Sequence, residues 1–347
     1  MRHISAIVLA IMAVLAGPAS AALRPAELGS AEAVLKWING YRANRDVAAV
    51  PAAVKALSQF GAFRDPENAG VYIGFIAGVI GTNPGQADDL IARMLPIAPE
   101  DHWVLVRAIA YSSHPDWKGL LGRFVDRMPT RKKMIEQYVG GKLPILTELS
   151  FAEPPGTIDK VKDALRVDKY FRETPPKKTE LDPSPMVLDT LWGYYFATGA
   201  YGPVARIELM LPWSKDKNDV EKLTIGSMAK YTLATNAARD TKLLFMLKAS
   251  SRQQPKAVVP VLTEVIEAAE TVETAKIRRE AIAALDDLKR KGPGSRRDMA
   301  VWGQVGEGAV AVGCIAAAAA SVGVLGIPCV VGGAVSSAGL RYLSTPQ

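Results

Sequence analysis

The sequence contains few of the side chains that bind metals or carry out redox and nucleophilic chemistry. Only two of its 347 residues are cysteines and only three are histidines. Cys314 and Cys329 both lie near the C-terminus, and two thiolates cannot supply the four ligands of a structural zinc site. An oxidising compartment would permit a disulfide between them, but the bridge depends on where the intervening chain turns, so it stays open here.

Motifs of several well-known catalytic and phosphate-binding sites are also lacking. The chain has no Gly-x-Ser-x-Gly nucleophile elbow and no His-Glu-x-x-His zinc motif. Gly141-Lys142 lacks the earlier glycine and the following serine or threonine of a phosphate-binding loop. We therefore predict no catalytic residue, no metal ion and no cofactor.

Two histidines, His102 and His114, follow the N-terminal region, with Asp101 and Asp116 nearby. The stretch between the histidines is typical of one helix, so about 12 residues separate them by roughly 18 Å of rise. That distance is too large for both rings to bind one ion. Asp116 is interpreted as the cap of the next helix, and capping with loop packing is favoured over a catalytic histidine.

The stretch from Ser227 to Lys230 matches the Ser-x-x-Lys pattern of penicillin-recognising enzymes. The Ser-Asp-Asn-like element and the Lys-Thr-Gly strand of that family are missing, so Lys230 is interpreted as a surface residue of a helix. If the chain is an enzyme that acts on the cell wall or on peptides, its candidates are His102, His114, Ser227 and Lys230.

The N-terminus predicts export. Arg2 precedes an apolar run over 4–16, and Ala19-Ser20-Ala21 is a small-x-small cleavage site, so residues 1–21 form a signal peptide. The formal charge of +7 falls to +6 when Arg2 is removed. For an exported basic protein we predict no nucleic-acid partner and consider anionic envelope surfaces more probable. The expected location is the periplasm or the outside of the cell.

Apolar residues recur at helical spacing, and alternating runs of β-branched residues are lacking, which predicts an all-α protein. An example of the helical spacing is Val34, Ile38 and Tyr41. A capping residue followed by proline marks several predicted starts. These pairs are Asp65-Pro66, Asn83-Pro84 and Ser184-Pro185. Helices this short must stack to bury their apolar faces.

Proline-rich segments divide the predicted fold. We expect an N-terminal helical lobe over 22–142, a Pro-rich connector over 143–183 with one short helix, and a helical-repeat lobe over 184–292. A hydrophobic Ala/Gly-rich tail follows over 299–347. The predicted fold class is all-α, with stacked helical hairpins in an α-solenoid-like, two-lobed arrangement and a C-terminal helical hairpin.

A weak internal repeat relates the two lobes. A helix around Gly74 leads to Asn83-Pro84 and a second helix ending near Met94. A helix around Gly193 leads in the same way to Gly202-Pro203 and a second helix ending near Met210. The second helices differ in length, and the pattern predicts a duplication.

The stretch over 191–211 resembles one hairpin of the tetratricopeptide family. The matching positions are Leu191, Tyr195, Gly199, Tyr201 and Val204. Trp192 stands where that family usually has glycine, and later positions depart from its pattern. The resemblance covers about one 34-residue repeat. It implies helical stacking and a groove for a peptide or protein.

Two groups of side chains are candidates for binding. Arg123 and Arg127, with Arg131, are spaced by four and would form a basic stripe for phosphate or carboxylate groups, unless Pro129 breaks the helix and the stripe is only a solvated face. The second group could line a groove for a peptide or glycan, although neighbouring aromatics on a helix cannot all face one way and some must pack in the core. This group is Trp192, Tyr195, Tyr201 and Trp213.

The tail carries no charged residue over 308–340. That length could span a bilayer, but the basic residues before it oppose a single crossing after export. Gly323, Gly326 and Pro328 suggest two limbs, each too short to cross comfortably. The alternatives are a hairpin that caps the last repeat and one that associates with the membrane surface.

Together these patterns predict an exported helical-repeat scaffold or binding protein of the bacterial cell envelope, without catalysis. Its partner would be a protein, a peptide or the cell wall. The alternatives are a cell-wall or peptide-acting hydrolase, and a membrane-inserting or membrane-anchored protein that acts through its C-terminal hairpin.

Overall fold

The computed structural model describes residues 28–151, 180–271 and 283, and in these ranges the chain is all-α and forms no β-strand. The α-helices are α1 (Ala31–Gly40), α2 (Val50–Gln59), α3 (Gly70–Thr82), α4 (Ala87–Met94), α5 (His102–Tyr111), α6 (Trp117–Phe124), α7 (Lys132–Val139), α9 (Pro185–Thr198), α10 (Tyr201–Glu208), α11 (Val220–Ala237), α12 (Thr241–Ser250) and α13 (Val259–Thr271). Short 3-10 turns connect them, namely η3 (Tyr41–Ala43), η4 (Val47–Ala49), η5 (Pro66–Ala69), η6 (Pro84–Gln86), η7 (Pro99–Asp101), η8 (Val125–Arg127), η9 (Pro129–Arg131), η10 (Leu146–Glu148) and η12 (Leu211–Lys215).

Of the three helix starts predicted from a capping residue followed by proline, the one at Ser184 is confirmed as the start of an α-helix. The Ser184 side chain accepts a hydrogen bond from the backbone N–H of Val187 at 3.2 Å, and Pro185 opens α9. Asp65 caps a 3-10 turn rather than an α-helix. Asn83 does not cap the helix that follows it. Its Nδ2 donates to the Val79 carbonyl at 2.8 Å and so satisfies the end of α3.

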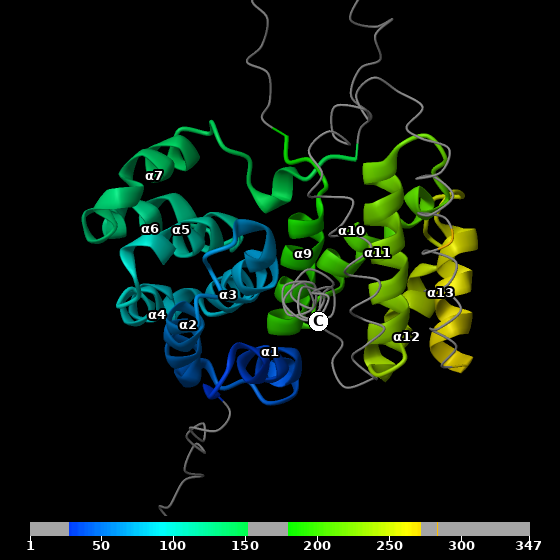
Figure 1. Cartoon of the computed structure of the whole chain (residues 1–347), viewed down its shortest axis with the longest axis horizontal. Helices are drawn as coiled ribbons and strands as arrows, with labels where there is room; N and C mark the ends of the chain where they lie inside the picture. The colour runs from blue at the N-terminus through cyan, green and yellow to red at the C-terminus, as the bar shows by residue number, and fades with distance from the viewer. Residues whose placement is uncertain (1–27, 152–179, 272–282, 284–347) are drawn as a thin grey trace, which may run out of the picture.

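Helices α3 and α9 form the central pair of the fold (Figure 1). Every residue of α3 from Gly70 to Ile80 is buried, so this helix has no solvent face. Its glycines bring the backbone of α9 very close. A Cβ atom added to Gly74 would lie 1.9 Å from the Thr190 carbonyl oxygen, and one added to Gly193 would lie 2.0 Å from that of Val71. The two helices pack through backbone, not through large side chains.

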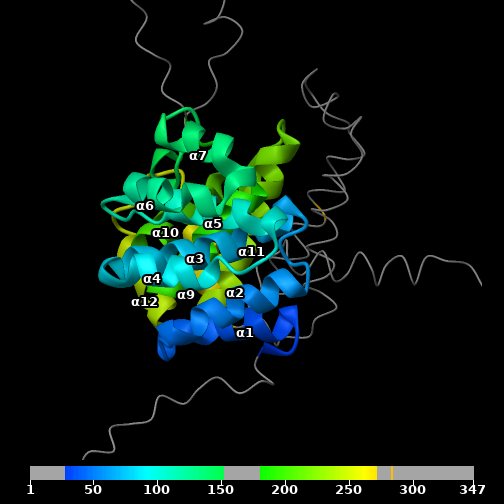
Figure 2. The same cartoon turned by 90° about the vertical axis from the view of Figure 1, so that its left-hand side faces the viewer.

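The remaining helices flank this pair on two sides. Helices α1, α2 and α4 to α7 lie on the side of α3, and α10 to α13 lie on the side of α9 (Figures 1 and 2). One hydrophobic cluster includes residues of both predicted lobes, from Val34 in α1 to Ala269 in α13. The α3–α9 contact therefore joins residues 28–142 and 184–271 through a shared core.

A polar contact near η3 also joins the two segments. The Arg42 guanidinium pairs with Asp240 at 2.6 Å and lies 4.7 Å from the centroid of the Tyr195 ring. Arg45 donates to the Thr198 carbonyl at 2.6 Å. Because Thr198 ends α9, this arginine satisfies a carbonyl that has no partner within its helix.

The ends of the predicted Pro-rich connector lie together. The backbone N–H of Ser150 donates to the Leu181 carbonyl at 3.0 Å, and that of Leu181 donates to the Glu148 carbonyl at 3.1 Å. The short helix predicted within 152–179 lies outside the described residues. The same is true of the signal peptide over 1–21, of Cys314 and Cys329, and of the tail over 299–347.

The stretch over 191–211 contains the end of α9 and the whole of α10, and the two helices contact each other. Gly199 ends α9 in the left-handed region, with φ of 66°, a conformation that glycine adopts without steric cost. Val204 in α10 is fully buried. Of the helices that the structure describes, none combines the length and apolar character needed to cross a membrane.

Candidate functional site

A buried carboxylate, Glu208, lies at the centre of a hydrogen-bonded cluster in the described residues. Glu208 ends α10 with an exposed fraction of 0%. The Tyr201 hydroxyl donates to its Oε2 at 2.9 Å, and the Ser250 hydroxyl lies 3.2 Å from both carboxylate oxygens. Gln254 donates to the same Oε2 through its amide nitrogen. These four residues, here called the Glu208 cluster, link α10 to the end of α12 and the turn after it.

Burial gives Glu208 an unusual protonation equilibrium. Loss of hydration raises the pKa of its carboxyl group to about 7, although the hydrogen bonds from Tyr201 and Ser250 oppose this rise. Burial also raises the pKa of the Tyr201 hydroxyl, which therefore stays a donor. A carboxyl group that exchanges its proton near neutral pH is suited to general acid–base chemistry, and it is equally suited to a pH-sensitive contact between helices.

Only one member of the Glu208 cluster was predicted from the sequence. Tyr201 was expected to bind a ligand, and the structure places it half-buried against Glu208. Glu208, Ser250 and Gln254 were missed. The signal that could have found Glu208 is an acid inside the apolar run from Ile207 to Leu211, because an acid in such a run requires buried partners.

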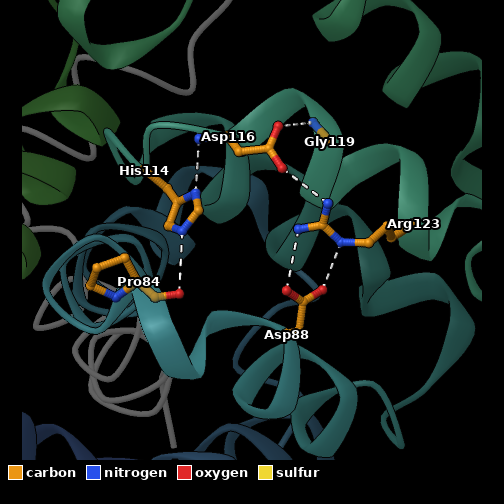
Figure 3. A network of polar contacts seen from close by, with 6 residues as sticks. All are labelled: Pro84, Asp88, His114, Asp116, Gly119 and Arg123. Carbon is orange, nitrogen blue, oxygen red and sulfur yellow. Dashed lines mark hydrogen bonds and ion pairs between the residues drawn. The ribbon is translucent and has the colours of Figure 1, made fainter.

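Arg123, predicted to bind anions, lies in a network of ion pairs (Figure 3). Its Nε and Nη2 donate to the two carboxylate oxygens of Asp88, at 2.8 and 3.2 Å, and its Nη1 donates to Asp116 at 2.9 Å. These hydrogen bonds lower the pKa of Asp116 and raise that of Arg123. The network joins the start of α6 to α4, and Arg123 would have to release an aspartate to bind a phosphate through the same nitrogens.

Asp116 and His114 hold the turn before α6 (Figure 3). The Asp116 side chain accepts from the backbone N–H of Gly119 at 3.1 Å, which confirms its predicted capping role. The backbone N–H of Asp116 donates to His114 Nδ1 at 3.0 Å, so the ring proton is on Nε2, which faces the Pro84 carbonyl at 3.5 Å. His114 therefore binds two loops together.

The predicted basic stripe does not lie on one continuous helix. The chain breaks at Met128 and Pro129 between η8 and η9, as the proline predicted. Arg127 instead donates to the Ala92 carbonyl at the end of α4, at 3.3 Å, and Arg131 donates to the Glu100 carbonyl. Each of these arginines therefore donates to a backbone carbonyl of an element earlier in the chain, α4 for Arg127 and η7 for Arg131. Anion binding by Arg123 and Arg127 stays a prediction.

The four aromatic candidates do not share one surface. Trp192 and Tyr195 are both 0% exposed, so they pack in the core. Trp192 Nε1 donates to Thr232 Oγ1 at 3.0 Å, and the Tyr195 hydroxyl donates to Asp240 at 2.5 Å. Trp213 is half-buried in η12, and Tyr201 belongs to the Glu208 cluster. The structure thus brings Trp192 and Tyr195 together in the core. Tyr201 does not belong to this pair, because it contacts Glu208 instead.

The four enzyme candidates belong to two pairs: His102 and His114 lie at the start of α5 and after its end, whereas Ser227 and Lys230 lie three residues apart on α11. His102 begins α5, where its Nε2 faces the Leu95 carbonyl at 3.1 Å, and the whole of α5 separates it from His114. Ser227 is buried in α11. Lys230 was predicted on the surface, but its side chain is 7% exposed and pairs with Glu264 at 2.5 Å. Burial of its stem between α11 and α13 corrects that prediction.

In the part of the chain that the structure describes, no group of three or more histidine, cysteine, aspartate or glutamate side chains could hold a metal ion. Comparison of the chain with protein-family models, with curated proteins and with solved structures finds no match.

Proposed function

We propose that the chain is an exported helical-repeat scaffold or binding protein of the bacterial cell envelope and acts without catalysis. Its partner would be a protein, a peptide or the cell wall. The proposal combines the signal peptide predicted over 1–21 with a stack of short helices that share one core. A chain built in this way offers its partners a wide surface at fixed geometry.

The observation that supports this proposal most strongly is what the reactive side chains contact. Lys230 is paired with Glu264, which also pairs with Lys215, so this lysine connects α11 to α13. His114 binds two loops, and Arg123 joins α6 to α4. Side chains that could carry out chemistry are thus occupied in holding helices together.

The contact between α3 and α9 supports the repeat arrangement. Gly74 lies against Thr190, and Gly193 lies against Val71, so the two helices exchange equivalent contacts. The internal repeat predicted from the sequence places Gly74 and Gly193 at corresponding positions. A pair of duplicated hairpins stacked face to face would produce this reciprocity.

The test is extraction of cell membranes with salt and with carbonate, followed by crosslinking of whatever remains with the protein. A scaffold should be released as a soluble or peripheral protein and should carry a reproducible crosslinked partner. Turnover of an envelope substrate by the purified mature chain, abolished by one polar substitution, would contradict the proposal.

A hydrolase of cell-wall or peptide substrates is the second candidate, and the Glu208 cluster is the observation that favours it. A carboxyl group with a pKa of about 7 could donate and accept a proton at neutral pH. Purified protein should then release product from peptidoglycan or peptides, and Glu208→Gln should abolish that release without lowering the melting temperature. His102→Ala and Ser227→Ala are the matched tests of the earlier candidates.

A further inference from the structure

The outward face of α12 combines an exposed aromatic ring with positive charge. Leu243, Leu247 and Ser250 form the buried face of this helix, which packs against α11 and α13 (Figure 1). Helical geometry places Phe245 on the opposite side, about 160° from Leu243. Phe245 is 72% exposed, more than any other large hydrophobic side chain of the described residues.

The charge around Phe245 is strongly one-sided. Residues 239–256 contain five cations and a single acid, Asp240, for a net charge of +4. Asp240 is already occupied by Arg42 and Tyr195, and Lys248 pairs with Glu270. The other four cations are exposed and make no ion pair with the described residues; they are Arg239, Lys242, Arg252 and Lys256.

We propose that this α12 face docks the protein on an anionic lipid surface. Phe245 would enter the boundary between headgroups and acyl chains. Lys242 on α12, together with Arg239 before the helix and Arg252 and Lys256 after it, would face the lipid phosphates. An exposed aromatic ring with basic residues on the same helix and in the adjoining turns is a combination that anionic membrane surfaces bind. The inference deepens the proposed function, because it assigns an envelope partner of defined chemistry to one surface of the scaffold.

A lipid surface fits this face better than a protein partner does. A stable protein interface buries about 800 Å² on each side around an apolar centre. The other exposed large hydrophobic side chains that the structure describes are Phe60, which follows α2, and Val139, which ends α7. The α12 face therefore has one protruding ring and no apolar centre, whereas binding to an anionic membrane surface can combine a single buried ring with the attraction of flanking cations to lipid phosphates.

The test is co-sedimentation of the purified mature chain, residues 22–347, with vesicles of phosphatidylglycerol and phosphatidylcholine or of phosphatidylcholine alone. The protein should bind the anionic vesicles at low salt and should dissociate in high salt, since salt screens exposed charges. Phe245→Ala should weaken binding about tenfold. Lys242→Gln and Arg252→Gln should each weaken it about fivefold.

Phe60→Ala and Lys55→Gln are the matched controls, because they remove an exposed ring and an exposed charge from α2 and its end. They should leave vesicle binding unchanged. Equal binding by wild type and the α12 variants, or equal binding to both kinds of vesicle, would overturn the proposal. The second result would assign membrane binding to another part of the chain, such as residues 308–340.

Two further results would also overturn the lipid proposal and would identify the true occupant. If Phe245→Ala lowers the melting temperature and leaves vesicle binding intact, the chain itself covers this ring. If Phe245→Ala removes a crosslinked protein partner and leaves vesicle binding intact, the face binds a protein. In that case the lipid inference fails while the scaffold proposal stands.

Discussion

Replacing Gly193 with alanine should destabilise the whole helical body, because α9 and α3 leave no room for a methyl group at this position. The added Cβ would lie 2.0 Å from the Val71 carbonyl oxygen and 2.7 Å from the Phe75 nitrogen. Both atoms belong to the backbone of α3, so no side chain can turn aside to relieve the contact. The two helices would have to move apart by about 1 Å to restore van der Waals distances.

The size of the effect follows from two opposing terms. Overpacking a well-packed interior typically costs about 1–3 kcal/mol and occasionally more, and this contact lies at the centre of the core. Alanine favours a helix over glycine by about 1 kcal/mol, which offsets part of that cost. We expect a net loss of about 2 kcal/mol in the free energy of unfolding. For a body of this size, the melting temperature should fall by about 4–8 °C.

Gly122→Ala is the matched control for this measurement. Gly122 also lies inside a helix, α6, but it is exposed, and an added Cβ would meet no atom within 4 Å. It should stabilise the protein by about 0.5–1 kcal/mol through helix propensity alone. Thermal unfolding followed by circular dichroism measures both variants. Shifts of equal size and sign would refute the close approach of α3 and α9.

Three other substitutions test separate contacts of the fold. The carboxyl pKa of Glu208 is about 7 in the fold and 4.5 in an ordinary setting, so the folded state binds more protons than the unfolded state between these pH values. The free energy of unfolding should therefore fall by up to about 3 kcal/mol as the pH rises from about 5 to 8. Urea unfolding at several pH values should show this decline, and Glu208→Gln should remove it. Lys230→Ala should cost about 1–3 kcal/mol in the same assay, whereas Lys215→Ala, which removes a 58% exposed partner of Glu264, should cost less than about 1 kcal/mol. Asp116→Ala should lower the melting temperature through loss of the α6 cap, and the melting temperature of Asp116→Asn, which retains a capping side chain, should lie closer to wild type.

Local features of the fold could be predicted because their causes lie within a few residues. The cap at Ser184 bonds a backbone N–H three residues away, and the cap at Asp116 does the same. Pro129 breaks the chain through its own ring and the residue before it. Apolar spacing identified the helices for the same reason, since the spacing of one buried face is a property of one helix.

Contacts between distant segments could not be predicted from those patterns. The sequence analysis predicted a repeat that includes Gly74, but nothing in the neighbourhood of this glycine indicates that the Thr190 carbonyl lies against it. The Glu208 cluster depends in the same way on Ser250 and Gln254, which follow more than one helix later. The aromatic candidates are an example, because a tryptophan or tyrosine side chain can line a groove or pack in a core equally well. Only the packing of α9 shows that Trp192 lies in the core.

The reciprocity of the α3–α9 contact agrees with the internal repeat predicted from the sequence. The sequence offset that relates Gly74 to Gly193 also relates Val71 to Thr190. Gly74 therefore lies against Thr190, three residues before Gly193, and Gly193 lies against Val71, three residues before Gly74. In a self-complementary interface, one small residue creates two close contacts when it is duplicated, so both copies must stay small. The glycines at both positions are what a duplicated hairpin would require to pack on itself.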